Sequence, residues 1–262
     1  MNDDSVAPSR VFFAFLLRDL TVARRELPFF LIRTTMQPLM FVIVFGFILP
    51  RIGLIPGNYT QIMLPGVIAL SLTISAIQSV ALPMVQDFGF TREIEDRLLA
   101  PAPIELVAIE KVVGGVLQGI VAALFILPVS RLIMGPIAGL TFRNVPLLLA
   151  ATILGGAAFS AIGLYLGTAI APQQIGLMFS VILAPMIMFG CTYYPWSGLS
   201  RVPAMKWAVL VNPLVYVAEA MRAALTPEVP HMPVAALLAA LVVITAIFLF
   251  LGLRAFEKRA MS

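Results

Sequence analysis

The stretch VAALLAALVVITAIFLFLGL, Val234 to Leu253, holds 20 consecutive residues without one charged side chain. A helix of about 20 apolar residues is long enough to cross the hydrocarbon core of a bilayer. Because the stretch is apolar on every helical face, no face of it is suited to water. It therefore predicts a transmembrane helix.

Five further runs resemble it in length and in lacking Asp, Glu, Lys, Arg and His: Thr34–Pro50, Ile62–Val85, Val112–Val129, Val145–Ile170 and Ile175–Tyr194. Of the 262 residues, 61% are hydrophobic, and the mean hydropathy is +1.02. A soluble domain has roughly 45–50% apolar residues. We expect an all-α membrane protein that forms a single domain over residues 1–262 and has six transmembrane helices.

Basic residues flank these spans unequally. Eleven of the seventeen Lys and Arg residues lie before the first span, between the second and third, or after the last: Arg10, Arg18, Arg24, Arg25, Arg33, Arg92, Arg97, Lys111, Arg254, Lys258 and Arg259. Cytoplasmic loops are the ones enriched in Lys and Arg. The distribution predicts a multi-pass protein of the cell (plasma) membrane with both termini in the cytoplasm.

The leader RVFFAFLLRDLTVARRELP precedes the first span and is amphipathic. Phe13, Leu16, Leu17 and Leu20 fall on one helical face, whereas the charged residues point elsewhere. Residues 10–28 are therefore predicted to form an interfacial helix in the cytoplasmic headgroup layer, ending near Pro28. The alternative is a leader whose only role is in topology.

The segment 195–233, predicted to be extracellular, contains the apolar stretch WAVLVNPLVYVAEAMRAAL, which Asn212 and Pro213 interrupt. Two short re-entrant helices would satisfy both the apolarity and the break, because irregular backbone at membrane depth must be sheltered. Glu219 and Arg222 are three residues apart and can pair on one helix face. The alternative is an exposed pair of little energetic value.

Small residues recur at four-residue spacing in the third and fourth spans. The pairs are Gly115 with Gly119, Gly156 with Ser160 and Gly163 with Gly167. This spacing predicts close packing of these helices against their neighbours.

Several kinds of chemistry lack the residues they need. The sequence has no Gly-Lys-Ser/Thr phosphate loop and no carboxylate within a predicted span. His231 is the only histidine and lies in the outer segment, Cys191 is the only cysteine, and no cluster has metal-ligand spacing. We expect no catalytic site and no cofactor on the chain itself. A passive pore and a machine driven by a partner both remain open.

The segment FGFTREIEDRLLAPAPIE, Phe88 to Glu105, holds six charged residues between two spans. Thr91 can cap a short helix that ends near Leu99, before Pro101 and Pro103. We predict that the cytoplasmic loop 87–105 carries a docking helix, with a solvated loop helix as the alternative. Its candidate contact residues are Phe90, Arg92, Glu93, Asp96, Arg97 and Leu98.

Four features in this order resemble the membrane subunits of ABC-2-type ABC transporters. They are the basic leader into QPLMFVIVFGFILP, LPGVIA opening the second span, REIEDRLLAPAP after it, and YYPWSGLSRVPAMKWAVLVNPLVYVAEAMRAAL before the last span. The resemblance implies a six-helix half-transporter that pairs with a second, identical or homologous permease subunit. It also implies two separate ABC ATPase subunits, and these partners would bind ATP and Mg. The chain itself would contact membrane lipids and no nucleic acid.

The resemblance also assigns roles to segments. Residues matching Arg92 to Leu99 form the family's coupling helix, and the turn APQQIG, Ala171 to Gly176, is similar to a second cytoplasmic contact. The helices matching Trp207 to Leu225 help to close the extracellular exit. The predicted outer gate comprises Asn212, Pro213, Glu219 and Arg222.

Flexible and aromatic side chains on the first and fifth spans are candidates for a substrate pathway. They are Gln37, Met40, Phe41, Phe179, Met186 and Phe189. Such side chains suit amphipathic drugs or lipids. Ordinary packing or lipid-facing roles are the alternative for each position, and a lipid-linked glycan is the alternative substrate. A scaffold or channel without an ATPase partner is the alternative function.

Overall fold

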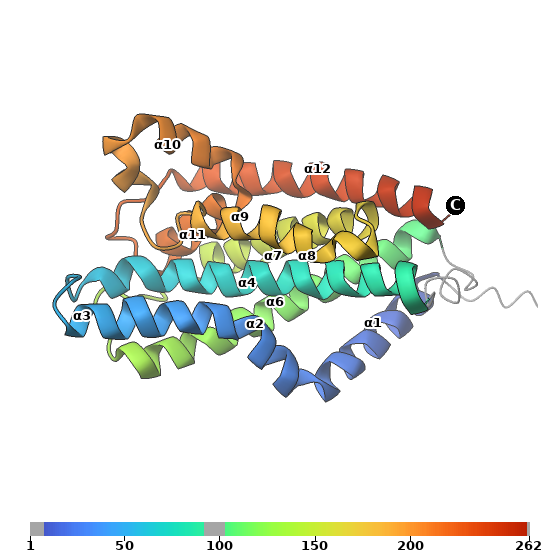
Figure 1. Cartoon of the computed structure of the whole chain (residues 1–262), viewed down its shortest axis with the longest axis horizontal. Coiled ribbons are helices and arrows are strands. Elements are labelled where there is room, and N and C mark those ends of the chain that lie inside the picture. The colour runs from blue at the N-terminus through green and yellow to red at the C-terminus, as the bar shows by residue number, and fades with distance from the viewer. Residues whose placement is uncertain (1–7, 92–102, 261–262) are drawn as a thin grey trace, which may run out of the picture.

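The computed structural model describes residues 8–91 and 103–260, and every regular element among them is a helix. Five helices are long and apolar enough to cross a membrane: Leu27–Arg51, Tyr59–Gly89, Ile104–Met134, Val145–Ala169 and Val234–Ala260. They confirm five of the predicted spans. Figure 1 shows them running along the long axis of the molecule as one bundle.

Three of these spans are single α-helices, and two change their winding along the way. The single helices are α6 (Ile104–Met134), α7 (Val145–Ala169) and α12 (Val234–Ala260). The first span joins α2 (Leu27–Phe41), a π-helical segment (Val42–Ile48) and α3 (Leu49–Arg51). The second is α4 (Tyr59–Gln86), which runs into a π-helical turn, Asp87–Thr91.

The remaining predicted span, Ile175–Tyr194, is helical only in part. A 3₁₀ turn (Pro172–Gln174), α8 (Ile175–Met178), a π-helical turn (Phe179–Leu183) and α9 (Ala184–Met188) form one apolar helix that is too short to count as a span. At its end, side chains take the place of the backbone N–H groups that would continue the helix. The Asn212 side chain donates to the carbonyl of Met186, and the Tyr194 hydroxyl donates to the carbonyl of Met188. Residues 189–194 leave the helix, so the six-span layout is not confirmed as predicted.

The segment before the last span is bent at the predicted break. A 3₁₀ turn (Trp196–Arg201), α10 (Pro203–Ala208) and a second 3₁₀ turn (Val209–Val211) precede α11 (Pro213–Leu225). The two arms meet at 100°. Asn212 caps α11 by accepting from the Leu214 amide, and Pro213 fits the first helical turn because its missing N–H is not needed there.

The helix α4 lies at the centre of the bundle and α12 at its edge. In their most apolar windows, 83% of α4 but only 11% of α12 is buried within the protein. A helix covered by protein on all sides needs small neighbours, and a helix at the edge is left facing lipid.

Glycines allow the helices around α4 to approach it closely, as predicted. A Cβ atom on Gly163 of α7 would lie 2.8 Å from the carbonyl oxygen of Ile77, and one on Gly119 of α6 would lie 2.9 Å from that of Leu72. Those distances are shorter than real Cβ contacts, so only glycine fits at either position. The predicted close packing of α6 and α7 is confirmed for these contacts.

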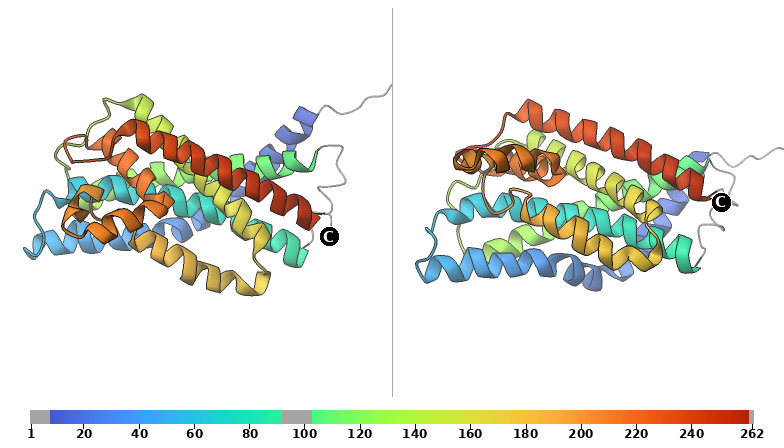
Figure 2. Two further views of the ribbon diagram at one scale, coloured as in Figure 1. Left: turned by 90° about the horizontal axis from the view of Figure 1, so that it is seen from above. Right: turned by 45° about the horizontal axis from the view of Figure 1, so that its top comes forward.

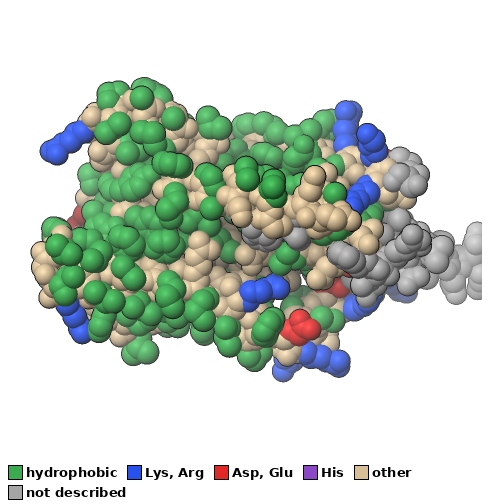
Figure 3. Space-filling model, viewed as in Figure 1, with side chains coloured by type: hydrophobic (Ala, Val, Ile, Leu, Met, Phe, Trp, Pro, Cys, Tyr) green, Lys and Arg blue, Asp and Glu red, His purple; other side chains and the backbone are tan. Residues whose placement is uncertain are grey.

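One end of the bundle gathers several segments that are far apart in sequence. In Figure 1, the end of α12, the end of α4, the start of α6 and the turn between α7 and α8 all lie at the right. Hydrophobic side chains cover much of the face seen in Figure 3, and Lys and Arg side chains gather mainly toward that same end.

The leader forms α1 (Pro8–Arg25), followed by a turn at Glu26 and then α2. Figures 1 and 2 show α1 diverging from the line of α2 at this turn. Two of its predicted apolar-face residues, Phe13 and Leu17, are exposed. The helix ends three residues before Pro28, which lies in the first turn of α2 instead. A place in the headgroup layer stays a prediction.

Candidate functional site

The predicted pair on α11 is buried, so the alternative of an exposed pair is wrong. The side chains of Glu219 and Arg222 are both 0% exposed, and the Arg222 Nη1 atom donates to Glu219 Oε1. They are one helical turn apart, and α11 packs on α4, α7 and α12. Taking a carboxylate and a guanidinium out of water costs several kcal/mol each unless their hydrogen bonds are met.

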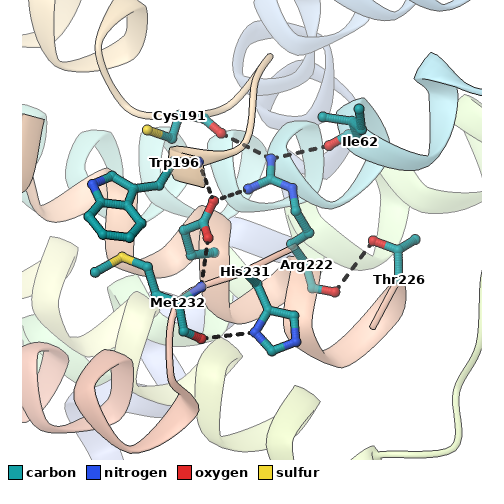
Figure 4. A network of polar contacts seen from close by, with 8 residues as sticks. Ile62, Cys191, Trp196, Arg222, Thr226, His231 and Met232 are labelled. Atoms are coloured by element: carbon teal, nitrogen blue, oxygen red, sulfur yellow. Dashed lines mark hydrogen bonds and ion pairs between the residues drawn. The ribbon is translucent and has the colours of Figure 1, made fainter. Parts of the chain in front are cut away.

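Backbone groups from three other segments meet most of those hydrogen bonds (Figure 4). Glu219 Oε1 also accepts from the Trp196 amide at 3.0 Å, and Oε2 accepts from the Met232 amide at 3.0 Å. Arg222 Nη2 donates to the carbonyls of Cys191 at 3.0 Å and Ile62 at 3.2 Å. The pair therefore joins α11 to the loop after α9, the turn before α12 and the first turn of α4.

The loop after α9 is held at further points. The Tyr59 hydroxyl donates to the Tyr193 carbonyl, and the Trp196 indole N–H donates to the carbonyl of Lys206. Cys191 has φ +52°, in the left-handed region that most residues avoid. At Gly66 of α4, a Cβ atom would lie 1.9 Å from the Thr192 carbonyl oxygen. The loop is thus clamped directly onto α4.

Two predicted pathway residues and two predicted gate residues share one cavity. Met186 and Phe189, at the end of α9, line an apolar cavity of about 450 Å³ together with Asn212 and Pro213, at the bend before α11. The Asn212 amide bonds the Met186 carbonyl at 2.7 Å across this junction. Asn212 is the only side chain with a hydrogen-bonding group among the described residues of the lining.

The other predicted pathway residues are not gathered there. Phe41 lies 4.5 Å from the ring of Tyr193, measured between centroids, so it packs on the clamped loop. Gln37 and Met40 are exposed on α2. The side chain of Phe179 lies outside the described part of the structure.

The predicted docking helix also falls outside the described residues. Arg92, Glu93, Asp96, Arg97 and Leu98 are among the residues not described, and Phe90 is described only in its backbone, within the turn Asp87–Thr91. The prediction of their role therefore stays a prediction.

The residues around that segment are described and are densely packed. The Phe88 ring meets Phe256 of α12 edge to face, with 5.5 Å between centroids, and Arg259 lies 5.0 Å above it. A Cβ atom on Gly89 would lie 2.4 Å from Cγ of Pro172. Pro172 belongs to the turn predicted as the second cytoplasmic contact. The structure therefore places this turn against Gly89, which lies just before the predicted docking helix.

The sequence profile of the ABC-2 type transporter family matches residues 10–226, which run from α1 to the end of α11. The chain belongs to the ABC-2 type transporter family. Its similarity to a named permease agrees: the inner membrane transport permease YadH of Escherichia coli (strain K12) is 30% identical over 195 residues, 70% of each chain. The proteins of that name from Escherichia coli O157:H7 and Shigella flexneri give the same values. No solved structure matches this chain.

Family membership and the apolar helices make this chain a multi-pass membrane subunit of an ABC transporter. Such a subunit works with ATPase partners. The matched range includes the bend at Asn212, the buried pair and the predicted docking segment, and it excludes α12.

Sequence reasoning found the pair of Glu219 and Arg222 but not its partners. Those partners are backbone groups near Ile62, Cys191, Trp196 and Met232, and no sequence pattern marks a backbone group as a hydrogen-bond partner. It also missed a partly buried ion pair between Lys111 of α6 and Asp19 of α1. The position of Lys111 at the end of a charged segment was the only signal.

Proposed function

We propose that this chain is the membrane-spanning permease of an ATP-driven exporter that moves an amphipathic drug or lipid-like substrate outward across the cytoplasmic membrane. Two ATPase subunits and a second permease subunit complete the transporter. The observation that carries the proposal is the separation of two features. The segments around the predicted docking loop gather at one end of the bundle, and α10 and α11 lie toward the other (Figure 1). The bend between α10 and α11 borders the apolar cavity.

The two ends are joined by helices that run the length of the bundle. α4 runs from the carbonyl of Ile62, which receives Arg222, to the turn that begins at Asp87. It is buried along most of its length, so a displacement of its Asp87 end would be passed to the helices packed around it. Tightly packed bundles respond to such pushes by switching between discrete arrangements. Closure of the ATPase subunits would in this way reach the clamp around Glu219.

The substrate class follows from the cavity at the bend. Its lining is apolar apart from Asn212, and methionine and phenylalanine side chains adapt to ligands of varied shape. An acyl chain or an aromatic drug leaves no polar group unpaired there. A hydrated glycan would lose hydrogen bonds to water without replacement, at a cost for each unpaired group.

Affinity purification of the tagged chain from its native membrane tests the assembly. We expect an ATPase subunit to co-purify, with vanadate-sensitive hydrolysis that amphipathic drugs or lipids stimulate. Reversing charge with Arg92→Glu and Arg97→Glu should weaken ATPase binding at least about a hundredfold, because each of the two lost ionic hydrogen bonds is worth about 1.5–3 kcal/mol. The matched control is Arg201→Glu, on an exposed residue of the opposite end.

Three outcomes would each contradict one part of the proposal. Equal recovery of the ATPase with the charge-reversed chain would show that 92–97 is not the docking segment. Repeated absence of any ATPase from the native chain would favour the scaffold or channel. Stimulation by lipid-linked glycans alone would replace the drug or lipid with the alternative substrate.

A further inference from the structure

A buried lysine connects α1 to the bundle. Lys111 lies near the start of α6, and its side chain is only 7% exposed. Its Nζ atom donates to Asp19 Oδ2 of α1 at 2.7 Å. A second carboxylate is also close, since Asp87 Oδ2 lies 4.0 Å from the same nitrogen. One ammonium group is thus shared between two acids that belong to different elements.

The two acids belong to α1 and to the turn that precedes the predicted docking helix. Asp19 is on α1, which turns away from α2 at Glu26 (Figure 2). Asp87 begins the π-helical turn that leads into residues 92–102. Lys111 follows that same segment in the sequence and lies in the first turns of α6. The three charges therefore join α1 to both ends of the predicted docking loop.

The space beneath α1 leaves room for it to change position. A cavity of about 510 Å³ lies between the α1–α2 turn and the helices α4 and α6. Its charged lining residues come from both sides: Arg18, Asp19, Glu26, Arg33, Asp87 and Lys111. A helix packed tightly on its neighbours could not move without opening a void, whereas α1 borders a void already.

We propose that Lys111 is a positioning residue that exchanges between two partners: bound to Asp19 it holds α1 against the bundle, and bound to Asp87 it releases α1. A lysine side chain has a flexible four-carbon stem, so its ammonium group moves between the two acids by a change of rotamer. Asp19 and Asp87 both have further interactions in the structure, so neither is left unpaired when Lys111 turns to the other. A switch of this kind requires two arrangements that differ by only a few kcal/mol, which is part of the proposal.

Only the role of this exchange in transport rests on the proposed function. In that role, α1 would be released when an ATPase subunit pushes on the docking loop. The exchange itself is a property of the single chain. It can be measured without an ATPase, so its failure would leave the proposed function standing, and the failure of ATPase docking would leave the exchange standing.

Hydrogen–deuterium exchange of the full chain in lipid nanodiscs tests it through the amides of α1. Asp19→Asn removes the holding partner and keeps the shape of the side chain, so α1 amides should exchange about tenfold faster. Lys111→Met should do the same. Asp87→Asn removes the releasing partner, so α1 amides should exchange about threefold more slowly than in the native chain.

The proposal predicts that Asp19→Asn speeds amide exchange of α1 and that Asp87→Asn slows it. An ion cluster that only stabilises the fold would not produce changes of opposite sign. If Lys111 only stabilises the fold, both variants loosen α1, and faster or unchanged exchange in Asp87→Asn overturns the proposal. Unchanged exchange in Asp19→Asn overturns it as well. Resistance of the buried Cys191 thiol to maleimide, at the far end of the molecule, checks that each variant is folded.

Discussion

The carboxylate of Glu219 and the guanidinium of Arg222 stabilise the structure around α11 only while both are present. Each is fully buried, and each bonds backbone groups that would otherwise lack partners. Removing one member leaves the other as an uncompensated charge in a region without water. Breaking a buried pair in this way costs about 3–5 kcal/mol.

Glu219→Gln and Arg222→Met should each destabilise the protein by about 3–5 kcal/mol, seen as a lower midpoint of thermal unfolding in lipid nanodiscs. The double variant should cost less than the sum of the two, because it leaves no unpaired charge. Glu228→Gln is a control, since Glu228 is an exposed carboxylate of the same loop region. Additive losses would show that the two side chains act separately.

Cys191 reports on the same network. Burial, with a smaller contribution from the Glu219 carboxylate, raises the pKa of the Cys191 thiol to about 12. Almost no thiolate is then present at pH 8, and the thiolate is the form that reacts with maleimide. The native chain should resist labelling, and Glu219→Gln should expose the thiol.

At the scale of elements, the fold depends on how closely helices approach α4. Gly66 of α4 lies against the Thr192 carbonyl of the clamped loop, whereas Gly114 of α6 has open space where a Cβ atom would be. Both residues are glycines within transmembrane helices. Replacing each by alanine therefore distinguishes the effect of packing from the intrinsic preference of a helix for alanine.

Gly66→Ala and Gly114→Ala should change stability in opposite directions. The first places a methyl group onto backbone that cannot move aside, and overpacking of this kind costs about 1–3 kcal/mol. The second meets nothing and should gain up to about 1 kcal/mol from helix propensity. Thermal unfolding in nanodiscs measures both. A loss in both variants would mean that the open space beside Gly114 is needed for the fold.

The whole molecule has a charged end and an end with an apolar cavity, and the five apolar helices run between them. In the described part of the chain, most of the basic residues belong to α1, the start of α2, the start of α6 and the end of α12. The positive-inside rule predicts that this end faces the cytoplasm. Both the proposed docking and the proposed direction of transport depend on that orientation.

Cysteine labelling of intact cells tests the orientation. Ser200→Cys and Lys258→Cys place an exposed thiol at each end of the molecule, and native Cys191 is buried and contributes no background. A membrane-impermeant maleimide should label Ser200→Cys and leave Lys258→Cys unlabelled until the membrane is opened. The reverse pattern would invert the topology and with it the proposed exporter. Equal labelling of both in opened membranes is the control.

Much of the helical layout could be predicted from the sequence because membrane spans are local features. An apolar segment in lipid must satisfy its backbone hydrogen bonds internally, and a helix does so with neighbouring residues alone. The break at Asn212 and Pro213 was equally local, since proline cannot donate to the preceding turn. The span predicted at Ile175–Tyr194 was too long because Asn212 and Tyr194, both beyond α9, cap its carbonyls by hydrogen bonds that no local pattern reveals.

The sequence alone therefore determined that the chain is a helical membrane protein, where five spans lie, and that α11 begins at a break. Its motifs, in order along the chain, also indicated the transporter family. Only the tertiary structure decided that Glu219 and Arg222 are buried among backbone groups of three other segments, and that Lys111 lies between Asp19 and Asp87. Hydropathy acts along a helix, whereas a buried charge depends on groups that packing brings from distant parts of the chain.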